Sequence, residues 1–117
     1  MTNPTIISLD QLTSALRVNE VDEFWNALTD DYFVGELIPG SRWVALDRVG
    51  REAGSLGLAK DARIVVYCSG PSCPNSRDAA TKLATLGFTN VRLFEGGLEA
   101  WKNSGRGVEV LPRAKAA

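Results

Sequence analysis

The sequence contains no histidine and only two cysteines, Cys68 and Cys73, among its 117 residues. Without histidine, neither a Ser-His-Asp triad nor a Cys-His pair can be assembled from this chain. Two cysteines are too few for a disulfide scaffold, and they leave a structural zinc site short of ligands. We therefore expect neither a bound metal nor a cofactor.

The chain also lacks an excess of charge of one sign and any long hydrophobic run. Lysine and arginine number 13 against 14 aspartates and glutamates, which gives a formal net charge of −1. No basic run could follow a phosphate backbone, so we expect no nucleic-acid partner. No apolar stretch approaches the ~18 residues that span a bilayer, and Met1 opens a polar segment rather than a signal peptide. These absences predict a cytoplasmic protein without membrane contact.

What remains is an ordinary globular composition, with 44% hydrophobic and 23% charged residues. Since a domain usually has roughly 100–200 residues, we expect a single domain over residues 1–111. Residues 112–117 are small, basic and polar, which is typical of a disordered tail.

Two hydrophobic periods alternate along the chain. Apolar and β-branched runs predict strands at 5–7, 24–28, 43–46, 62–67 and 91–94, although a helix fits 24–28 almost as well. Helical spacing predicts helices at 9–16, 75–86 and 98–103, the first preceded by a capping-box pair, Ser8 and Gln11. Glycines weaken any helix over 47–56, which stays ambiguous. Strands and helices that alternate over short connections predict an α/β fold, with a central parallel sheet flanked by helices on both faces.

The most informative segment joins a predicted buried strand to a predicted helix. Cys68 follows the run Val65-Val66-Tyr67 and precedes a loop of small residues and prolines that ends near Asn75. Ligands of open parallel sheets bind at this carboxyl edge, where a helix N-terminus stabilises an anion. We therefore expect the pKa of the Cys68 thiol to be lowered. A structural interpretation, in which Cys68 is a small buried hydrophobe, also fits its position.

Several motifs, in this order along the chain, resemble those of a rhodanese domain. They are Ile38-Pro39-Gly40-Ser41, the strand ending at Cys68 with its loop, the helix with Ala79-Ala80, Gly87-Phe88, and Phe94-Glu95-Gly96-Gly97-Leu98-Glu99-Ala100-Trp101. The last run is the most specific, and the resemblance extends from about Ile6 to Gly105.

The resemblance implies a rhodanese-like fold and a sulfurtransferase or persulfide carrier in which Cys68 is the nucleophile. Its thiolate would take the outer sulfur of thiosulfate or of a persulfide donor. A thiol, on a small molecule or a protein, or cyanide would then accept the sulfur. The candidate substrate-binding residues follow Cys68 around the loop: Ser69, Gly70, Pro71, Ser72, Cys73, Pro74, Asn75, Ser76 and Arg77.

The chain departs from the family pattern in ways that keep other functions open. The loop is extended if Ser76 takes the place of the serine that opens the family's helix. Asn26-Ala27-Leu28 replaces an Asp-Val-Arg-like segment, and Glu36-Leu37 replaces a Gly-His pair. Polar groups that brace the loop or the following turn are therefore changed or missing. Such a change favours the alternative of a catalytically silent binding domain.

The loop residues Cys73 and Pro74 bear on two further alternatives. Cys73 is either a bystander or a resolving thiol, which would form a disulfide with Cys68 and make the protein a redox-active or regulatory module. Related phosphatases and arsenate reductases place an anion-binding arginine where Pro74 stands, so neither activity is expected. Arg77 is the nearest cation to Cys68 along the sequence.

Overall fold

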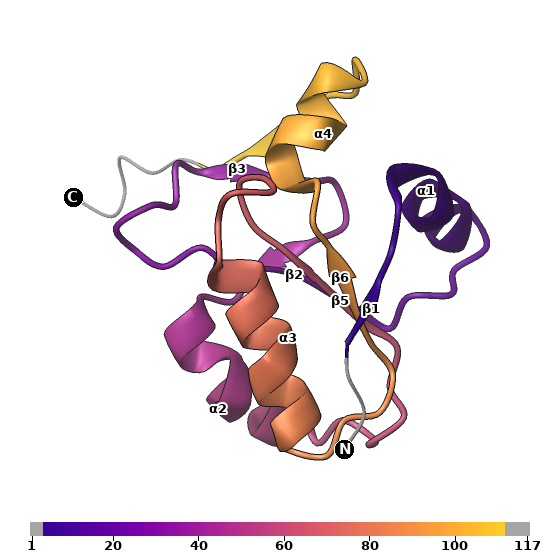
Figure 1. Ribbon diagram of the computed structural model, residues 1–117, viewed down its shortest axis with the longest axis vertical. Coiled ribbons are helices and arrows are strands. Elements are labelled where there is room, and N and C mark those ends of the chain that lie inside the picture. Colours follow the sequence, from indigo (N-terminus) through magenta and orange to yellow (C-terminus); the bar gives the residue numbers. More distant parts are fainter. Residues whose placement is uncertain (1–3, 112–117) are drawn as a thin grey trace.

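The described part of the chain, residues 4–111 of the computed structural model, contains both strands and helices (Figure 1). The elements are β1 (Thr5–Ile6), α1 (Leu9–Arg17), β2 (Glu23–Asn26), β3 (Glu36–Leu37), β4 (Arg42–Trp43), a 3-10 turn η1 (Leu46–Arg48), α2 (Val49–Leu56), β5 (Ile64–Tyr67), α3 (Asn75–Thr85), β6 (Val91–Phe94), α4 (Gly97–Asn103) and β7 (Glu109–Val110). The tail predicted at 112–117 lies outside the described residues. Within residues 4–111, no helix has the length and apolar character needed to cross a membrane.

The main sheet has five strands in the order β1-β6-β5-β2-β4, and every neighbouring pair is parallel. β5 lies at its centre, and all four of its residues are buried. The sequence Ile-Val-Val-Tyr suits this place because β-branched and aromatic side chains pack well on both faces of a sheet. The predicted α/β fold with a central parallel sheet is confirmed.

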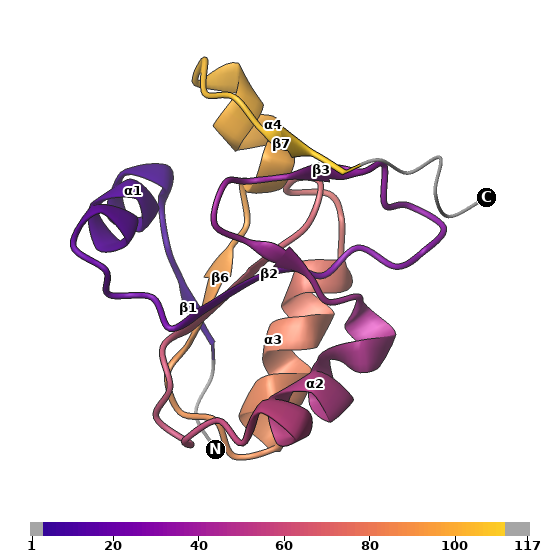
Figure 2. The same ribbon diagram turned by 180° about the vertical axis from the view of Figure 1, so that it is seen from behind.

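Helices cover both faces of this sheet (Figures 1 and 2). On one face, α2 and α3 pack against side chains such as Trp25, Ile64 and Val66. On the other face, α1 and α4 pack against a second cluster that contains Val65 and Tyr67. Side chains of a strand point alternately to its two faces, so successive residues of β5 pack into opposite hydrophobic cores.

The first two helices illustrate how far local sequence signals reach. The predicted capping box of α1 is confirmed, since Ser8 Oγ accepts from the Gln11 N–H at 3.1 Å and Gln11 Oε1 accepts from the Ser8 N–H at 2.9 Å. The ambiguous segment 47–56 contains α2, which tolerates two glycines because Val49 and Ala53, one turn apart, are both buried in the core. This helix therefore forms because of its tertiary packing rather than its local sequence preference.

The strand predicted at 43–46 is shorter than expected, because β4 contains only Arg42 and Trp43. Beyond it, the Val44 N–H still donates to the Asn26 carbonyl at 2.9 Å, and the Leu46 N–H donates to the Ala27 carbonyl at 3.0 Å. The chain therefore follows β2 for a few more residues, and then turns into η1.

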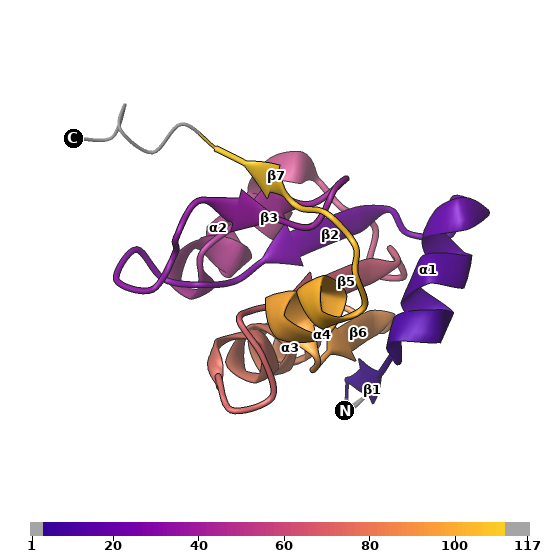
Figure 3. The ribbon, with the colours of Figure 1, turned by 90° about the horizontal axis from the view of Figure 1, so that it is seen from above.

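A second sheet lies at the carboxyl end of the parallel strands. β3 pairs with β7 in antiparallel register, with Glu36 opposite Val110 and Leu37 opposite Glu109. Figures 2 and 3 show this small sheet beside α4, at the end of the molecule toward which β5 and β6 point. Both strands have only two residues, and the sequence analysis did not predict them.

Candidate active site

Cys68 directly follows the central strand β5, and its side chain is 1% exposed. Its Sγ donates to Ser76 Oγ at 3.1 Å and to the Cys73 carbonyl at 3.4 Å. The backbone N–H of Ser76, in the first turn of α3, donates to the same sulfur at 3.4 Å. The sulfur therefore lies at the junction of strand, loop and helix that the sequence predicts, and it meets polar groups there.

The loop from Ser69 to Pro74 curls back over Cys68. A turn closes at its tip, where the Cys73 N–H donates to the Gly70 carbonyl at 3.1 Å, and the two corner residues, Pro71 and Ser72, are exposed. A proline suits the first corner position because its φ is already fixed near −65°. The turn returns Cys73 to the protein, where it packs against the same hydrophobic cluster as Cys68.

The start of α4 fixes the first two peptide units of the loop. The Leu98 N–H donates to the Cys68 carbonyl at 2.9 Å, and the Glu99 N–H donates to the Ser69 carbonyl at 2.8 Å. Carbonyl and N–H of one peptide unit point in opposite directions because the unit is planar and trans. With these two carbonyls turned toward α4, the N–H groups of Ser69 and Gly70 are turned away from it, toward the inside of the loop.

Gly97 allows this approach of α4 to the loop. Its φ is +60°, and a Cβ there would overlap the carbonyl oxygen of Cys68 and lie 2.9 Å from the Gly70 nitrogen. These neighbours are backbone atoms, which cannot move aside as a flexible side chain can. The second glycine of the Gly96-Gly97 pair is therefore required for α4 to lie against the Cys68 loop.

The two thiols of the loop affect the pKa of each other. Burial raises the pKa of Cys68 and so does the neighbouring Cys73 thiol, whereas the hydroxyl and N–H of Ser76 act in the opposite direction. Partial burial would also raise the pKa of Cys73, but the Cys68 thiol and the N–H groups of Asn75 and Ser69 outweigh it and lower that pKa. The expected lowering of the Cys68 pKa is wrong, because desolvation outweighs the helix N-terminus; the lowered pKa belongs to Cys73.

The predicted site residues fall into buried and exposed groups. Asn75 and Ser76 are buried with Cys68, whereas Ser69, Pro71, Ser72, Pro74 and Arg77 are exposed. The Asn75 Nδ2 is buried and has no hydrogen-bond partner within residues 4–111. The Arg77 guanidinium donates to Glu95 Oε2 at 2.6 Å in an exposed ion pair, so its charge is already partnered.

Buried polar groups brace the segment beside the loop. The Tyr67 hydroxyl accepts the Ile38 N–H at 2.9 Å and lies 2.7 Å from Ser41 Oγ. The fully buried Asn26 accepts the Leu28 N–H at 2.9 Å. Asn26 therefore supplies a bracing contact at the segment where the family's aspartate is replaced. The sequence analysis named Ser41 within a motif and Asn26 within a departure from the family, but it did not predict these contacts.

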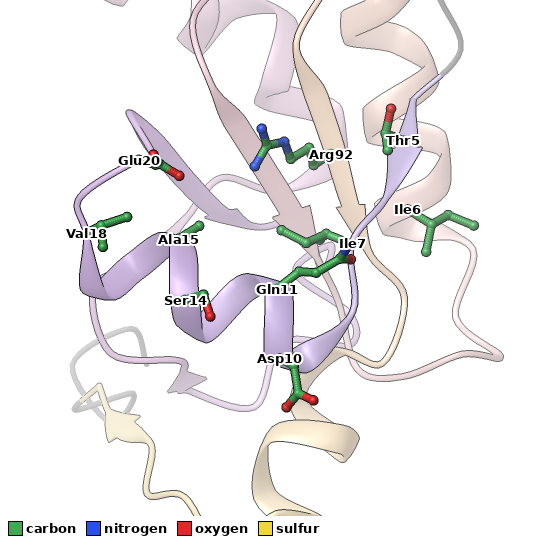
Figure 4. A pocket seen from close by; sticks show the side chains of 10 residues that line it. All are labelled: Thr5, Ile6, Ile7, Asp10, Gln11, Ser14, Ala15, Val18, Glu20 and Arg92. Carbon is green, nitrogen blue, oxygen red and sulfur yellow. The ribbon is translucent and has the colours of Figure 1, made fainter.

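Two grooves differ in their relation to the loop. One, of about 330 Å³, reaches Ser69 and is lined by Leu28, Tyr32, Val34, Glu36, Leu98, Glu99, Lys102 and Asn103. A larger one, of about 600 Å³, lies between β1 and α1, and Figure 4 shows Arg92 of β6 and Asp10 of α1 among the side chains around it. No residue of the Cys68 loop lines this larger groove, so only the smaller one adjoins the candidate site.

Known structures share this architecture. The Alr3790 protein from Anabaena sp. superimposes with a TM-score of 0.78 at 24% identity, over 94% of this chain and 84% of that one. Human single-domain sulfurtransferase TSTD1 gives 0.71 at 15% identity, over 86% and 97% of the two chains. A thiosulfate sulfurtransferase from Pseudomonas aeruginosa gives 0.73 at 19%, over 92% of this chain and 20% of that one. These similarities show the fold.

The sequence comparisons point the same way. No curated protein sequence matches the chain. The family model of the rhodanese-like domain matches residues 8–104, a range that contains the whole parallel sheet except β1, together with the Cys68 loop and α4. The chain therefore belongs to the rhodanese-like domain family.

Proposed function

We propose that the protein is a sulfurtransferase that carries sulfane sulfur as a persulfide on Cys68. The observation that supports this most directly is the place of the Cys68 sulfur, which receives the Ser76 N–H and contacts the Ser76 hydroxyl where β5 ends and α3 begins. A thiolate or persulfide formed there is an anion, and both groups can donate to it. The similarity to structures described as sulfurtransferases supports the same function.

The reaction begins when the Cys68 thiolate attacks the outer sulfur of thiosulfate. A sulfur–sulfur bond forms to Cys68 Sγ, the original sulfur–sulfur bond breaks, and sulfite leaves with its electron pair. The inward N–H groups of the loop and the unpartnered Asn75 Nδ2 are donors for the oxyanion. A thiol of a small molecule or a protein, or cyanide, then takes the sulfur, and the groove at Ser69 is the approach that we propose for it.

The same geometry argues against a phosphatase. Pro74 stands at the position of the phosphate-binding arginine, and it has no N–H to donate. The Arg77 guanidinium is already paired with Glu95, so the loop offers no free guanidinium to a phosphate dianion within the described residues.

For the compartment we propose the cytoplasm, because both cysteines are free thiols.

The test measures sulfite released from thiosulfate by the reduced protein. We expect one equivalent of sulfite per chain in a single turnover, and none from Cys68→Ser. Ser55→Ala is the control, because Ser55 is an exposed residue of α2 that lies outside the loop. Equal sulfite release by the wild type and Cys68→Ser would refute the proposal.

A further inference from the structure

The second cysteine of the loop lies against the first. The turn from Gly70 to Cys73 directs the chain back, so that the Cys73 carbonyl lies 3.4 Å from Cys68 Sγ. The two thiols lie close enough that each shifts the pKa of the other. Cys68 is buried, whereas Cys73 is only partly buried and reaches solvent. Two thiols held in this way have a high effective concentration toward each other.

We infer that Cys73 displaces the sulfur bound to Cys68 as hydrogen sulfide and forms a Cys68–Cys73 disulfide, so that the loop reduces sulfane sulfur as well as carrying it. This inference rests on the proposed loading of Cys68. It gives Cys73 a chemical step of its own, which distinguishes the chain from a carrier that waits for an external acceptor.

The step balances without an added oxidant. The Cys73 sulfur attacks Cys68 Sγ, a disulfide bond forms between them, and the bond from Cys68 Sγ to the sulfane sulfur breaks. The electron pair leaves on the sulfane sulfur, which departs as HS⁻ with one proton. The two thiols of the protein are oxidised to a disulfide, and the outer sulfur of thiosulfate is reduced to sulfide. Together with the loading step, thiosulfate and the dithiol protein give sulfite, HS⁻, one proton and the disulfide protein.

Three features of the loop favour this step. The N–H groups of Ser69 and Asn75 lower the pKa of the Cys73 thiol, which favours the thiolate that attacks. The turn from Gly70 to Cys73 already directs the loop back toward Cys68. Cys73 is also the accessible sulfur of the resulting disulfide, so an external thiol or dithiol reduces the protein by attack there and completes the cycle.

The experiment follows the fate of the sulfur in a single turnover. Reduced protein is mixed with one equivalent of thiosulfate, without oxygen and without any added thiol. Sulfite and sulfide are quantified, the intact mass is measured, and the cysteines are located by peptide mapping. For the wild type we expect one equivalent each of sulfite and sulfide, the loss of two hydrogen atoms in mass, and a Cys68–Cys73 cross-link.

Variants separate this inference from the proposed function. Cys73→Ser should release the same sulfite but no sulfide, and should retain one sulfur atom on Cys68 until a dithiol is added. Cys73→Ala provides the same test should the serine disturb the loop, and Ser55→Ala, at an exposed position of α2, should behave as the wild type. A wild type that releases sulfite yet keeps the sulfur, on Cys68 or on Cys73, would overturn the inference alone. Absence of sulfite from the wild type and from both Cys73 variants would overturn the proposed function and the inference with it.

Discussion

Replacement of Gly97 by alanine tests how the α4 turn holds the Cys68 loop. An L-residue at φ +60° costs about 1–2 kcal/mol relative to glycine. The new Cβ would also overlap the Cys68 carbonyl oxygen and approach the Gly70 nitrogen, so the backbone must shift, at a cost of roughly 1–3 kcal/mol. We expect a total loss of about 2–5 kcal/mol in the free energy of unfolding. At roughly 4 °C per kcal/mol for a domain of this size, the melting temperature should fall by about 8–20 °C.

Gly57 provides the matched control. Its φ of +63° is nearly the same, but nothing lies within 4 Å of a Cβ built there. Gly57→Ala should therefore show only the backbone term, about 1–2 kcal/mol. Thermal and urea unfolding of both variants measure the difference, with an unchanged m-value as the sign that the denatured state is the same. Sulfite release by Gly97→Ala should also fall at temperatures where the protein is folded. If the two variants unfold at the same temperature, the close approach of α4 to the loop does not contribute to stability.

Four other predictions concern single groups. Ser76→Ala should raise the pKa of Cys68 further, so that alkylation of Cys68 needs a higher pH, while Ser72→Ala leaves the profile unchanged; equal profiles would contradict the role of Ser76. Tyr67→Phe should cost about 1–3 kcal/mol, because the buried Ile38 N–H loses its acceptor, whereas Phe at the exposed Tyr32 should cost nothing measurable. Arg63 holds the pKa of Asp22 at about 2, below its ordinary 3.8, so the stabilisation is complete above pH 4 and is lost as the pH falls toward 2. The melting-temperature advantage of the wild type over Asp22→Asn should shrink over that range, and a constant difference would refute the assignment. Finally, an aryl phosphate should show no hydrolysis that Cys68→Ser abolishes, and such hydrolysis would contradict the argument from Pro74.

Strong local periodicity explains what the sequence could predict. β5, α3 and β6 each carry a clear hydrophobic pattern, and the structure places them where expected. β3 and β7 have two residues each and pair across most of the chain length, so no local pattern could indicate them. In α2, burial of Val49 and Ala53 outweighs the glycines that obscured the helix.

At the site, position was easier to predict than electrostatics. The order of strand, cysteine, loop and helix predicted that Cys68 lies where a strand ends beside a helix N-terminus, and the Ser76 N–H of α3 donates to its sulfur. Burial and the neighbouring Cys73 thiol raise the pKa of Cys68, whereas the groups at the start of α3 lower it. Sequence spacing alone cannot tell which of these opposing effects is larger. The ion pair between Arg77 and Glu95 depends likewise on how α3 lies beside the end of β6.

The edge position of β1 constrains the order in which the chain can fold during synthesis. β1 leaves the ribosome long before β6, which is its only partner among the described strands, with Thr5 opposite Arg92 and Ile6 opposite Leu93. At about 5–20 residues per second, the partner follows on the order of ten seconds later. During that interval β2, β4 and β5 can pair with one another, whereas Ile6 and its neighbours have no strand to join. The sheet therefore cannot form in the order of its strands along the chain, because β1 can pair only once β6 has been made.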